Sequence, residues 1–187
     1  MITFQKIKWK NFLSTGDHWS EIDFQGHTTN LVVGTNGSGK STMLDALTFA
    51  LFNKPFRKIN KSQLVNATNE KDCVVEVEFA VNNKDYLVRR SIKPNKFDIE
   101  VNGTLMHKES DDRLNQKILE ENILKVNYKS FTQIVILGSS SFVPFMQLST
   151  SNRRDVIEDL LDIRIFSAMN NLIKEKIRTE KEKIRSL

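Results

Sequence analysis

The sequence predicts an α/β fold that contains an antiparallel β-meander and ends in a long helix. A glycine-rich loop at residues 34–42 separates an apolar run from a segment whose apolar residues recur at helical spacing. Residues 75–101 then alternate between apolar and polar side chains, with turn-forming pairs between the alternating runs. Residues 167–187 contain no glycine or proline and are rich in Lys, Glu and Ile, which favours one continuous helix.

Three strands are expected before the glycine-rich loop. Residues 2–12 alternate imperfectly between apolar and basic side chains, and Trp19, Ile22 and Phe24 mark a second short strand. Residues 30–33, Asn-Leu-Val-Val, form a compact apolar run that ends at the loop. Such a run is typical of a strand that is buried on both faces.

A helix is expected directly after the loop, over residues 42–52, and Pro55 stops it. The next expected strand has three apolar residues on one face, Val75, Val77 and Phe79. Asn82-Asn83 favours a tight turn, and residues 97–101 form a further strand that ends at the turn pair Asn102-Gly103. Because no helical pattern separates these strands, an antiparallel meander is predicted.

The C-terminal part is expected to be mostly helical. Residues 110–124 have helical spacing, whereas residues 131–137 are apolar and β-branched and favour a strand, followed by a loop of small residues at 138–141. From residue 149 the chain turns helical again, with Ser149, Thr150 or Ser151 as the N-cap. An apolar stripe of this helix, expected to belong to the core, contains Val156, Leu160 and Leu161 and continues to Ile163 and Phe166.

A heptad pattern runs through the last segment and predicts the start of a coiled coil, with a plain amphipathic helix as the alternative. Of its eight a and d positions, two are polar. The eight positions are Ile163, Phe166, Asn170, Ile173, Ile177, Glu180, Ile184 and Leu187. The sequence thus predicts a globular part over residues 1–163 and a coiled-coil helix over residues 164–187, with a continuation of the pattern beyond the last residue.

Composition describes an ordinary soluble chain with a modest basic excess. The net charge of +5 suits a nucleic-acid partner, although many soluble proteins are slightly basic. Cys73 is the only cysteine, which excludes an intramolecular disulfide and fits a reducing cytoplasm. The N-terminus lacks the pattern of a signal peptide and the apolar runs are too short to span a bilayer, so no membrane partner is expected.

Residues 34–41, Gly-Thr-Asn-Gly-Ser-Gly-Lys-Ser, fill the pattern G-x-x-x-x-G-K-[ST], which indicates a phosphate-binding loop. Its glycines let successive backbone N–H groups converge on phosphate oxygens, and the following helix adds its free N–H groups and positive dipole end. Lys40 is expected beside the β- and γ-phosphates, and Ser41 is expected to offer its hydroxyl to Mg²⁺. The nucleotide-contacting set is Asn36, Gly37, Ser38, Gly39, Lys40, Ser41 and Thr42.

The loop does not choose among kinases, GTPases and motor-type ATPases. A phosphate-binding loop usually works with an acidic residue at the end of another apolar strand, which holds the magnesium ion. No apolar run of this sequence ends in such an acid, and the N-K-x-D pattern that favours a GTPase does not occur. The catalytic set is therefore expected to be incomplete within these 187 residues.

The motifs occur in an informative order. Lys10-Asn11-Phe12 precedes the loop and the meander, and Ser130-Phe131-Thr132-Gln133 and the stretch RRDVIEDLLDI follow. In this order they resemble the N-terminal half of the head of SMC-like ABC ATPases of the double-strand-break repair type (the SbcC type), and its phage members above all. The resemblance covers essentially the whole chain and includes the segments LFNKPFR, LVNATN, KPNKF and PFMQLST.

The resemblance implies an ATPase that uses Mg²⁺ and drives conformational change in a DNA double-strand-break or recombination nuclease complex. Gln133 matches the Q-loop glutamine that contacts Mg²⁺ and the attacking water, so Lys40 and Gln133 are the implied catalytic residues. The acid and the signature motif are carried by a C-terminal half of the head, which a coiled coil joins to this one. Further implied partners are a second head across the ATP, a nuclease subunit near the coiled-coil root, and double-stranded DNA.

One position departs from the family. Many members carry a basic residue directly after Asn-Phe that reaches the nucleotide, whereas this chain has Leu13. Lys10 is the candidate substitute for that contact.

Six basic residues are candidates for contacts with the DNA backbone, since phosphate contacts need only charge and reach. A solvated protein surface is the alternative for all of them. They are Arg89, Arg90, Lys93, Lys96, Lys54 and Arg57.

Two rival functions stay open at the level of sequence. One is a self-contained P-loop enzyme, such as a nucleotide kinase, against which the missing acidic strand end argues. The other is a non-catalytic basic DNA-binding module that keeps a vestigial loop.

Overall fold

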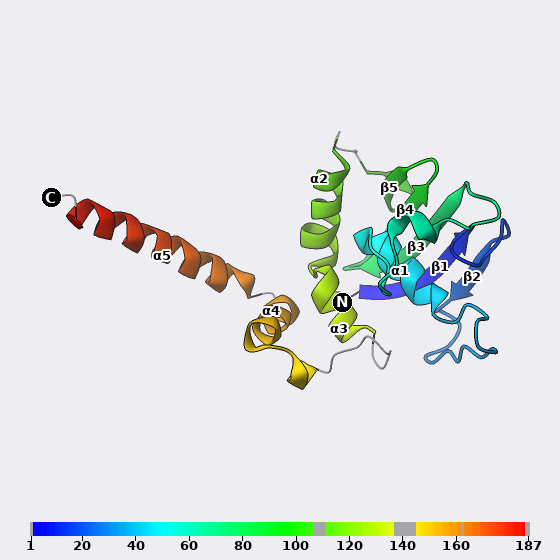
Figure 1. The fold of residues 1–187 in the computed structure, drawn as a ribbon, viewed down its shortest axis with the longest axis horizontal. Coiled ribbons are helices and arrows are strands. Elements are labelled where there is room, and N and C mark those ends of the chain that lie inside the picture. Colours follow the sequence, from blue (N-terminus) through cyan, green and yellow to red (C-terminus); the bar gives the residue numbers. More distant parts are fainter. Residues whose placement is uncertain (1, 107–110, 137–144, 162, 186–187) are drawn as a thin grey trace. The chain divides into compact units, whose positions relative to one another are not determined.

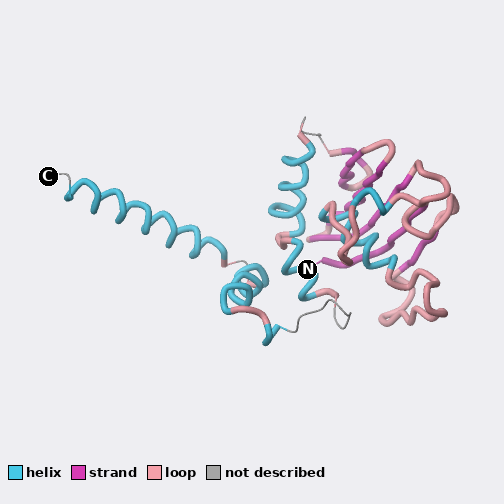
Figure 2. Tube along the Cα trace, viewed as in Figure 1, coloured by secondary structure: helices cyan, strands magenta, loops and turns pink. Residues whose placement is uncertain are grey.

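The computed structural model describes residues 2–106, 111–136, 145–161 and 163–185. The chain divides into two compact units, Met1–Leu124 and Lys125–Leu187, which are described one at a time. The boundary expected between residues 163 and 164 stays a prediction. Figures 1 and 2 show the sheet in the first unit and the helices of the second.

The first unit is built on one antiparallel sheet in the order β2-β1-β3-β4-β5-β6. The meander expected from the alternating pattern is confirmed, because β3 pairs with β4 and β4 with β5, with Val77 opposite Val88 and Val88 opposite Ile99. Both predicted N-terminal strands are also present. The strands are β1 (Ile2–Lys10), β2 (Ser20–Asp23), β3 (Cys73–Val81), β4 (Lys84–Ile92), β5 (Lys96–Val101) and β6 (Thr104–Leu105).

Helix α1 (Thr42–Phe52) covers one face of this sheet, as Figure 1 shows. Both partners are apolar at their contact, because alternate strand residues point to the same face. Phe49 and Leu51 of the helix and Ile7, Val75 and Val77 of the strands are fully buried. Each such side chain contributes about 1.5–3 kcal/mol relative to an exposed one, so this layer is the main source of stability in the unit.

A second helical segment stands beside α1 and closes the core. Helix α2 (Asp112–Lys117) continues directly into a π-helical turn, η2 (Ile118–Leu124), and η2 contacts α1. Its apolar side is only partly buried: Leu119 and Ile123 are in the core, whereas Leu114 is half-exposed. The helix predicted for residues 110–124 is confirmed from residue 112 onward. A short 3₁₀ turn, η1 (Lys61–Leu64), interrupts the irregular segment between α1 and β3.

The opposite face of the sheet is charged. Glu76 on β3 is almost fully buried and lies between Lys8 of β1 and Arg89 of β4, which also approaches Glu100 of β5 at 3.6 Å. Nζ of Lys8 lies 2.8 Å from Oε2 of Glu76, as an ion pair rather than an aligned hydrogen bond. This network joins four strands, β1, β3, β4 and β5, on one face of the sheet.

The strand predicted for residues 30–33 is wrong. These residues form no strand, and Leu31 and Val33 are 87% and 81% exposed. A strand buried on both faces needs neighbours on either side, and none of the described strands pairs with this segment. The segment is largely apolar, as its sequence indicates, but none of the six strands of the sheet covers it.

The strand predicted for residues 131–137 is also wrong over its described part. Residues 128–134 form helix α3 (Tyr128–Ile134), which begins at a cap that the apolar pattern does not reveal. The side chain of Asn127 accepts a hydrogen bond from the backbone N–H of Ser130 at 2.9 Å, which starts the helix three residues before the apolar run. Residues 137–144, including the predicted loop at 138–141, lie outside the described residues.

The second unit is helical and contains, after α3, the 3₁₀ turn η3 (Phe145–Gln147), α4 (Thr150–Leu160) and α5 (Arg164–Arg185). The predicted capping by residue 149 is confirmed, since Oγ of Ser149 accepts from the N–H of Asn152 at 3.3 Å. The stripe expected to be core is split: Val156 is buried, whereas Leu161 is exposed. The side chain of Leu160 and all of Leu187 lie outside the described residues.

The Glu76 network makes a prediction about acid stability. Burial alone raises the pKa of Glu76, but the close contacts and positive charges of Lys8 and Arg89 outweigh it and hold this pKa below its usual 4.5. The folded state then binds a proton at Glu76 less readily than the unfolded chain, so its stabilisation is complete above about pH 4.5 and is lost as the pH falls through the folded pKa. We expect Glu76→Gln to flatten the fall in unfolding free energy below pH 4.5.

Urea unfolding followed by tryptophan fluorescence between pH 3 and 7 measures this effect. Glu78→Gln, two residues along the same strand, is the matched control. Equal acid sensitivity in the original protein and the Glu76→Gln variant would show that the network does not stabilise the fold.

Candidate functional site

The glycine-rich loop has the backbone shape that its sequence predicts. Gly37 and Gly39 have backbone φ values of 86° and 91°, which residues other than glycine rarely adopt. Between and after them the N–H of Ser38 donates to the carbonyl of Thr35 at 3.2 Å, and the N–H of Thr42 donates to that of Gly39 at 2.9 Å. The loop thus makes two tight turns in succession and leads directly into α1.

Lys40 folds back over the loop. Its Nζ donates to the carbonyl oxygens of Gly34 and Thr35, both at 2.7 Å. A lysine ammonium has three N–H donors, so two of them fix the side chain over the loop and the third is left for an oxygen of a ligand. The positive charge of Lys40 is therefore held close to the backbone of the loop.

Ser41 stands at the start of α1 with its hydroxyl uncommitted to the helix. It is the N-cap residue, yet its side chain makes no capping hydrogen bond and it is exposed. Its carbonyl already accepts from the N–H groups of Leu44 and Asp45 at 3.2 and 3.3 Å. The hydroxyl at the positive end of the helix dipole is thus free to act as an oxygen ligand for Mg²⁺.

An open cavity of about 420 Å³ lies over the loop, within the size range of small-ligand sites. It brings together three segments that are distant in sequence: the turn after β1, the glycine-rich loop, and the segment after α1. Its lining residues are Leu13, Ser14, Asn36, Gly37, Gly39, Lys40, Ser41, Thr42, Arg57 and Ile59. Of the seven residues predicted to contact nucleotide, all except Ser38 line this cavity.

The wall opposite the loop is fixed by one buried asparagine. Nδ2 of Asn66 donates to the carbonyls of Leu13 and Thr15, both at 3.1 Å, and its Oδ1 accepts from the backbone N–H groups of Thr68 and Asn69. All hydrogen-bonding capacity of this amide is used, so the turn that carries Leu13 is held in one position.

Arg57 is a cavity residue that the sequence did not reveal as one. The buried carboxylate of Asp45, on the first turn of α1, accepts from the backbone N–H and the Nε of Arg57 at 2.9 and 2.6 Å, and Nη2 lies 2.6 Å from the same carboxylate. Nε and Nη2 share Oδ2 while the backbone N–H holds Oδ1, and these contacts together fix the guanidinium beside the loop. The two residues are twelve positions apart, and Arg57 lies in the irregular segment after α1, so no periodicity could have paired them.

Lys10 does not take the place of the basic residue that the family carries at position 13. Its Nζ lies 3.3 Å from Asp17 and 5.5 Å from the ring centre of Trp19, and it does not line the cavity. Alternation along β1 places Lys10 with Lys8 on the charged face of the sheet. Arg57, rather than Lys10, supplies a side-chain cation to the cavity besides Lys40.

Gln133 belongs to α3 in the second unit. It is half-buried, and its Oε1 is buried without a hydrogen-bond partner in the described part of the chain. An unpaired buried amide oxygen costs about 1–3 kcal/mol, which is a reason to look for a ligand or water at this atom.

The basic residues predicted to contact DNA do not form one surface. Arg90 is 5% exposed and Arg89 is paired with Glu76 and Glu100, so both have partners inside the fold. Arg57 points to the cavity. Lys93 and Lys96 are exposed at the turn between β4 and β5, and Lys54 is exposed after α1.

The described ranges show neither a metal-binding cluster nor a membrane-spanning helix. No group of three or more His, Cys, Asp or Glu side chains comes together there to hold a metal ion. None of the helices described is both long and apolar enough to cross a bilayer.

Comparison with known proteins places the chain in a family. A family model described as an AAA domain matches residues 6–187, and the chain therefore belongs to this family. Within it, the resemblance to SMC-like ATPase heads of the double-strand-break repair type is confirmed by the relatives that match.

Two curated relatives illustrate the relationship. Exonuclease subunit 2 of Enterobacteria phage T4 is 42% identical over 172 residues, which are 92% of this chain and 30% of the relative. A subunit of the nuclease SbcCD of Staphylococcus aureus (strain Newman) is 31% identical over 182 residues, which are 88% of this chain and 18% of the relative. The chain thus spans less than a third of the length of the curated relatives that it matches.

A solved structure has the same fold. It comes from work on ATP-driven dimerization and DNA-stimulated activation of SMC ATPases, and it matches with a TM-score of 0.53 at 21% identity. The match covers 84% of this chain and 99% of the solved one. At that identity the likeness concerns the fold, and it confirms the predicted α/β head architecture.

The Asp45–Arg57 pair makes a prediction about stability. Arg57→Met leaves a buried carboxylate without its charged partner, so we expect the unfolding free energy to fall by about 1–3 kcal/mol. Asp45→Asn combined with Arg57→Met removes both charges, and we expect it to cost less than the sum of the two single changes.

Urea titrations of the three variants measure these differences, with Lys58→Met on the neighbouring exposed lysine as the control. Strict additivity of the two changes would mean that the pair does not interact.

Proposed function

We propose that this chain is the ATP-binding half of an SMC-like ATPase head that drives conformational change in a DNA double-strand-break or recombination nuclease complex. The observation that carries the proposal is the joint geometry of the loop: two left-handed glycines, a lysine ammonium held over them, and an uncommitted serine hydroxyl at a helix start. A chain that belongs to this family and builds this cradle is suited to bind ATP with Mg²⁺.

Lys40 and Ser41 take the roles of charge and metal ligand in this proposal. Mg²⁺ supplies neutralisation of the phosphate charge when bound, with Ser41 and Gln133 as its side-chain ligands. The backbone N–H groups of residues 36–42 hold the phosphates, and Lys40 stabilises the charge that develops on the γ-phosphate as water attacks. Arg57 reaches the same cavity, so we assign it to the nucleotide rather than to DNA.

Hydrolysis requires a C-terminal half of the same head in this proposal. The exposed apolar run at residues 30–33 supports it, because Leu31 and Val33 precede the loop directly and have no strand beside them. Apolar strand-forming residues left without neighbours are suited to pair with a strand of another segment. We infer that such a segment, carrying the missing acid, completes the sheet at this position.

A second head is expected to complete the ATP site from the other side. Asn36, Gly37 and Ser38 are exposed, so the outer side of the phosphate cradle is accessible to another molecule. The solved structure of the same fold is described in terms of ATP-driven dimerization, and we extend that behaviour to this chain.

The exposed apolar residues of helix α5 are the evidence for two proposed partners, a coiled-coil helix and a nuclease subunit near the start of that coiled coil. Phe166, Ile173, Ile177 and Ile184 lie on the predicted heptad seam, and all are about half exposed or more. A second apolar stripe lies beside the seam, over the first turns alone: Ile165, Met169 and Leu172 are also more than half exposed. One partner helix covers only the seam, so the wider face near the start of α5 is suited to a further protein, which we propose is the nuclease subunit.

Double-stranded DNA is the proposed substrate of the complex. The names of the relatives, an exonuclease subunit and a nuclease subunit, support this assignment together with the basic net charge of +5. Lys93, Lys96 and Lys54 are the exposed members of the predicted set and stay the candidates for backbone contacts. We place the protein in the cytoplasm, where this DNA would be processed.

ATP hydrolysis with and without a C-terminal half tests the proposal. We expect negligible turnover by these 187 residues alone and recovery when the C-terminal half and DNA are supplied, because the second acid and the signature motif come from outside this chain. Lys40→Ala should then lower the recovered rate by about 100-fold or more, since it removes the charge beside the γ-phosphate.

Lys58→Ala is the control for the loss of a nearby exposed cation. Robust turnover by the chain alone would favour a self-contained P-loop enzyme and reject the split site. If the affinity for DNA is the same with and without ATP, and the C-terminal half does not restore hydrolysis, a DNA-binding module with a vestigial loop is favoured.

A further inference from the structure

The C-terminal end of α1 is held by side chains from two other elements. The last carbonyls of a helix have no partner inside it, and they need donors from elsewhere. Here the carbonyl of Ala50 accepts from Nε of Arg90 at 3.0 Å, and that of Leu51 accepts from Nε2 of Gln116 at 2.9 Å. The N–H of Asn53 donates to the carbonyl of Phe49 at 2.9 Å and completes the cap.

Arg90 is bound from several sides. It is 5% exposed, its guanidinium lies 3.7 Å from the ring centre of Phe97 on β5, and its Nη2 donates to Oε1 of Gln116 at 2.6 Å. Gln116 in turn donates to Oε1 of Glu120 at 2.7 Å. Burial lowers the pKa of Arg90 to about 10, and the charges of Asp112 and Glu120 oppose that fall, so the group is a cation at neutral pH.

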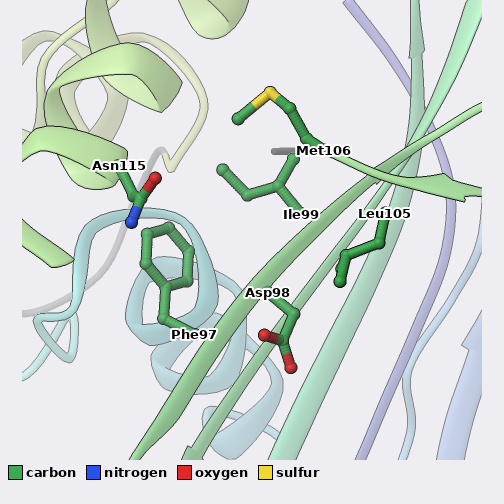
Figure 3. Close-up of a pocket in the computed structure, with 6 residues that line it drawn as sticks. All are labelled: Phe97, Asp98, Ile99, Leu105, Met106 and Asn115. Atoms are coloured by element: carbon green, nitrogen blue, oxygen red, sulfur yellow. The ribbon is translucent and has the colours of Figure 1, made fainter. Parts of the chain in front are cut away.

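The ring of Phe97 that Arg90 contacts also lies beside α2. Figure 3 shows the ring of Phe97 beside Asn115 of α2, at a hollow that is also lined by Ile99 and Met106. The hollow has a volume of about 10 Å³, no more than one water molecule occupies. A cation at the negative end of the helix dipole is also favourable, which adds to the attraction between Arg90 and α1.

We propose that Arg90 and Gln116 are positioning residues for the phosphate-binding loop. The loop runs directly into α1, and an 11-residue helix moves as a rod, so fixing its C-terminal end fixes the depth and rotation of its first turn. Ser41 directly precedes that first turn as its N-cap, and the loop N–H groups that we assign to the phosphates lead into it. Shifts of about 1 Å are costly for such contacts, and a buried clamp at the far end prevents them.

This inference rests on the proposed function, since it concerns how well the loop binds nucleotide. It also changes the place of Arg90, from a candidate DNA contact to a buried link between β4, α1 and α2.

Binding of a fluorescent ATP analogue with Mg²⁺ to the 187-residue chain is the test. Arg90→Lys keeps the charge but loses the fork that joins Ala50 to Gln116, and Gln116→Leu loses the cap on Leu51. We expect each to raise the dissociation constant by about tenfold at a temperature where circular dichroism shows the variant fully folded. The dissociation constant of the double variant should also rise by no more than about tenfold over that of the original chain, because the two side chains act as one clamp.

Arg113→Lys, on the exposed side of α2, is the control and should bind like the original chain. A purely structural role lowers the melting temperature while leaving the dissociation constant of the folded variants within twofold of the original, and that result overturns the inference. Should Arg90→Lys fail to fold, Gln116→Leu decides by the same criterion. Failure of the unaltered chain to bind the analogue rejects the proposed function itself and the inference with it.

Discussion

The attachment of α1 to the sheet is the interaction on which the rest of this structure depends. Phe49 and Leu51 of the helix and Ile7, Val75 and Val77 of the strands are all fully buried. The glycine-rich loop, which we propose binds phosphate, runs directly into the first turn of the helix, and the last turn of the helix is capped by Arg90 and Gln116. The core that stabilises the first unit is therefore also the support that holds the nucleotide site in place.

Much of this arrangement follows from patterns that are local in sequence. Period-two alternation predicted the meander, because one face of β3 had to be buried, and the loop and α1 were predicted from a motif that specifies its own backbone shape. Two segments were misread for physical reasons. Residues 30–33 are apolar without a neighbouring strand, and residues 131–134 are helical because the Asn127 cap starts the helix before the β-branched run.

The site residues that follow one another in the sequence were predictable, whereas those that the fold brings together from distant positions were not. The glycines, Lys40 and Ser41 follow from one motif, whereas the contacts between Asp45 and Arg57, and between Arg90 and Ala50, join residues 12 and 40 positions apart. Basic residues identified by charge alone proved to be of four kinds: a cavity residue, Arg57, a buried cap, Arg90, an ion-paired sheet residue, Arg89, and exposed lysines such as Lys96. Charge counts cannot separate these roles, since burial decides among them.

We propose that the fold presents a preformed phosphate cradle at the start of a helix whose far end is already fixed. Amide hydrogen exchange of the chain, with and without MgATP, measures both features. We expect slow exchange in the last two turns of α1 before nucleotide is added, and new protection on adding MgATP that is confined to residues 36–45. Rapid exchange at the C-terminal end of α1 in the free chain, or MgATP protection that bypasses the loop, would contradict it.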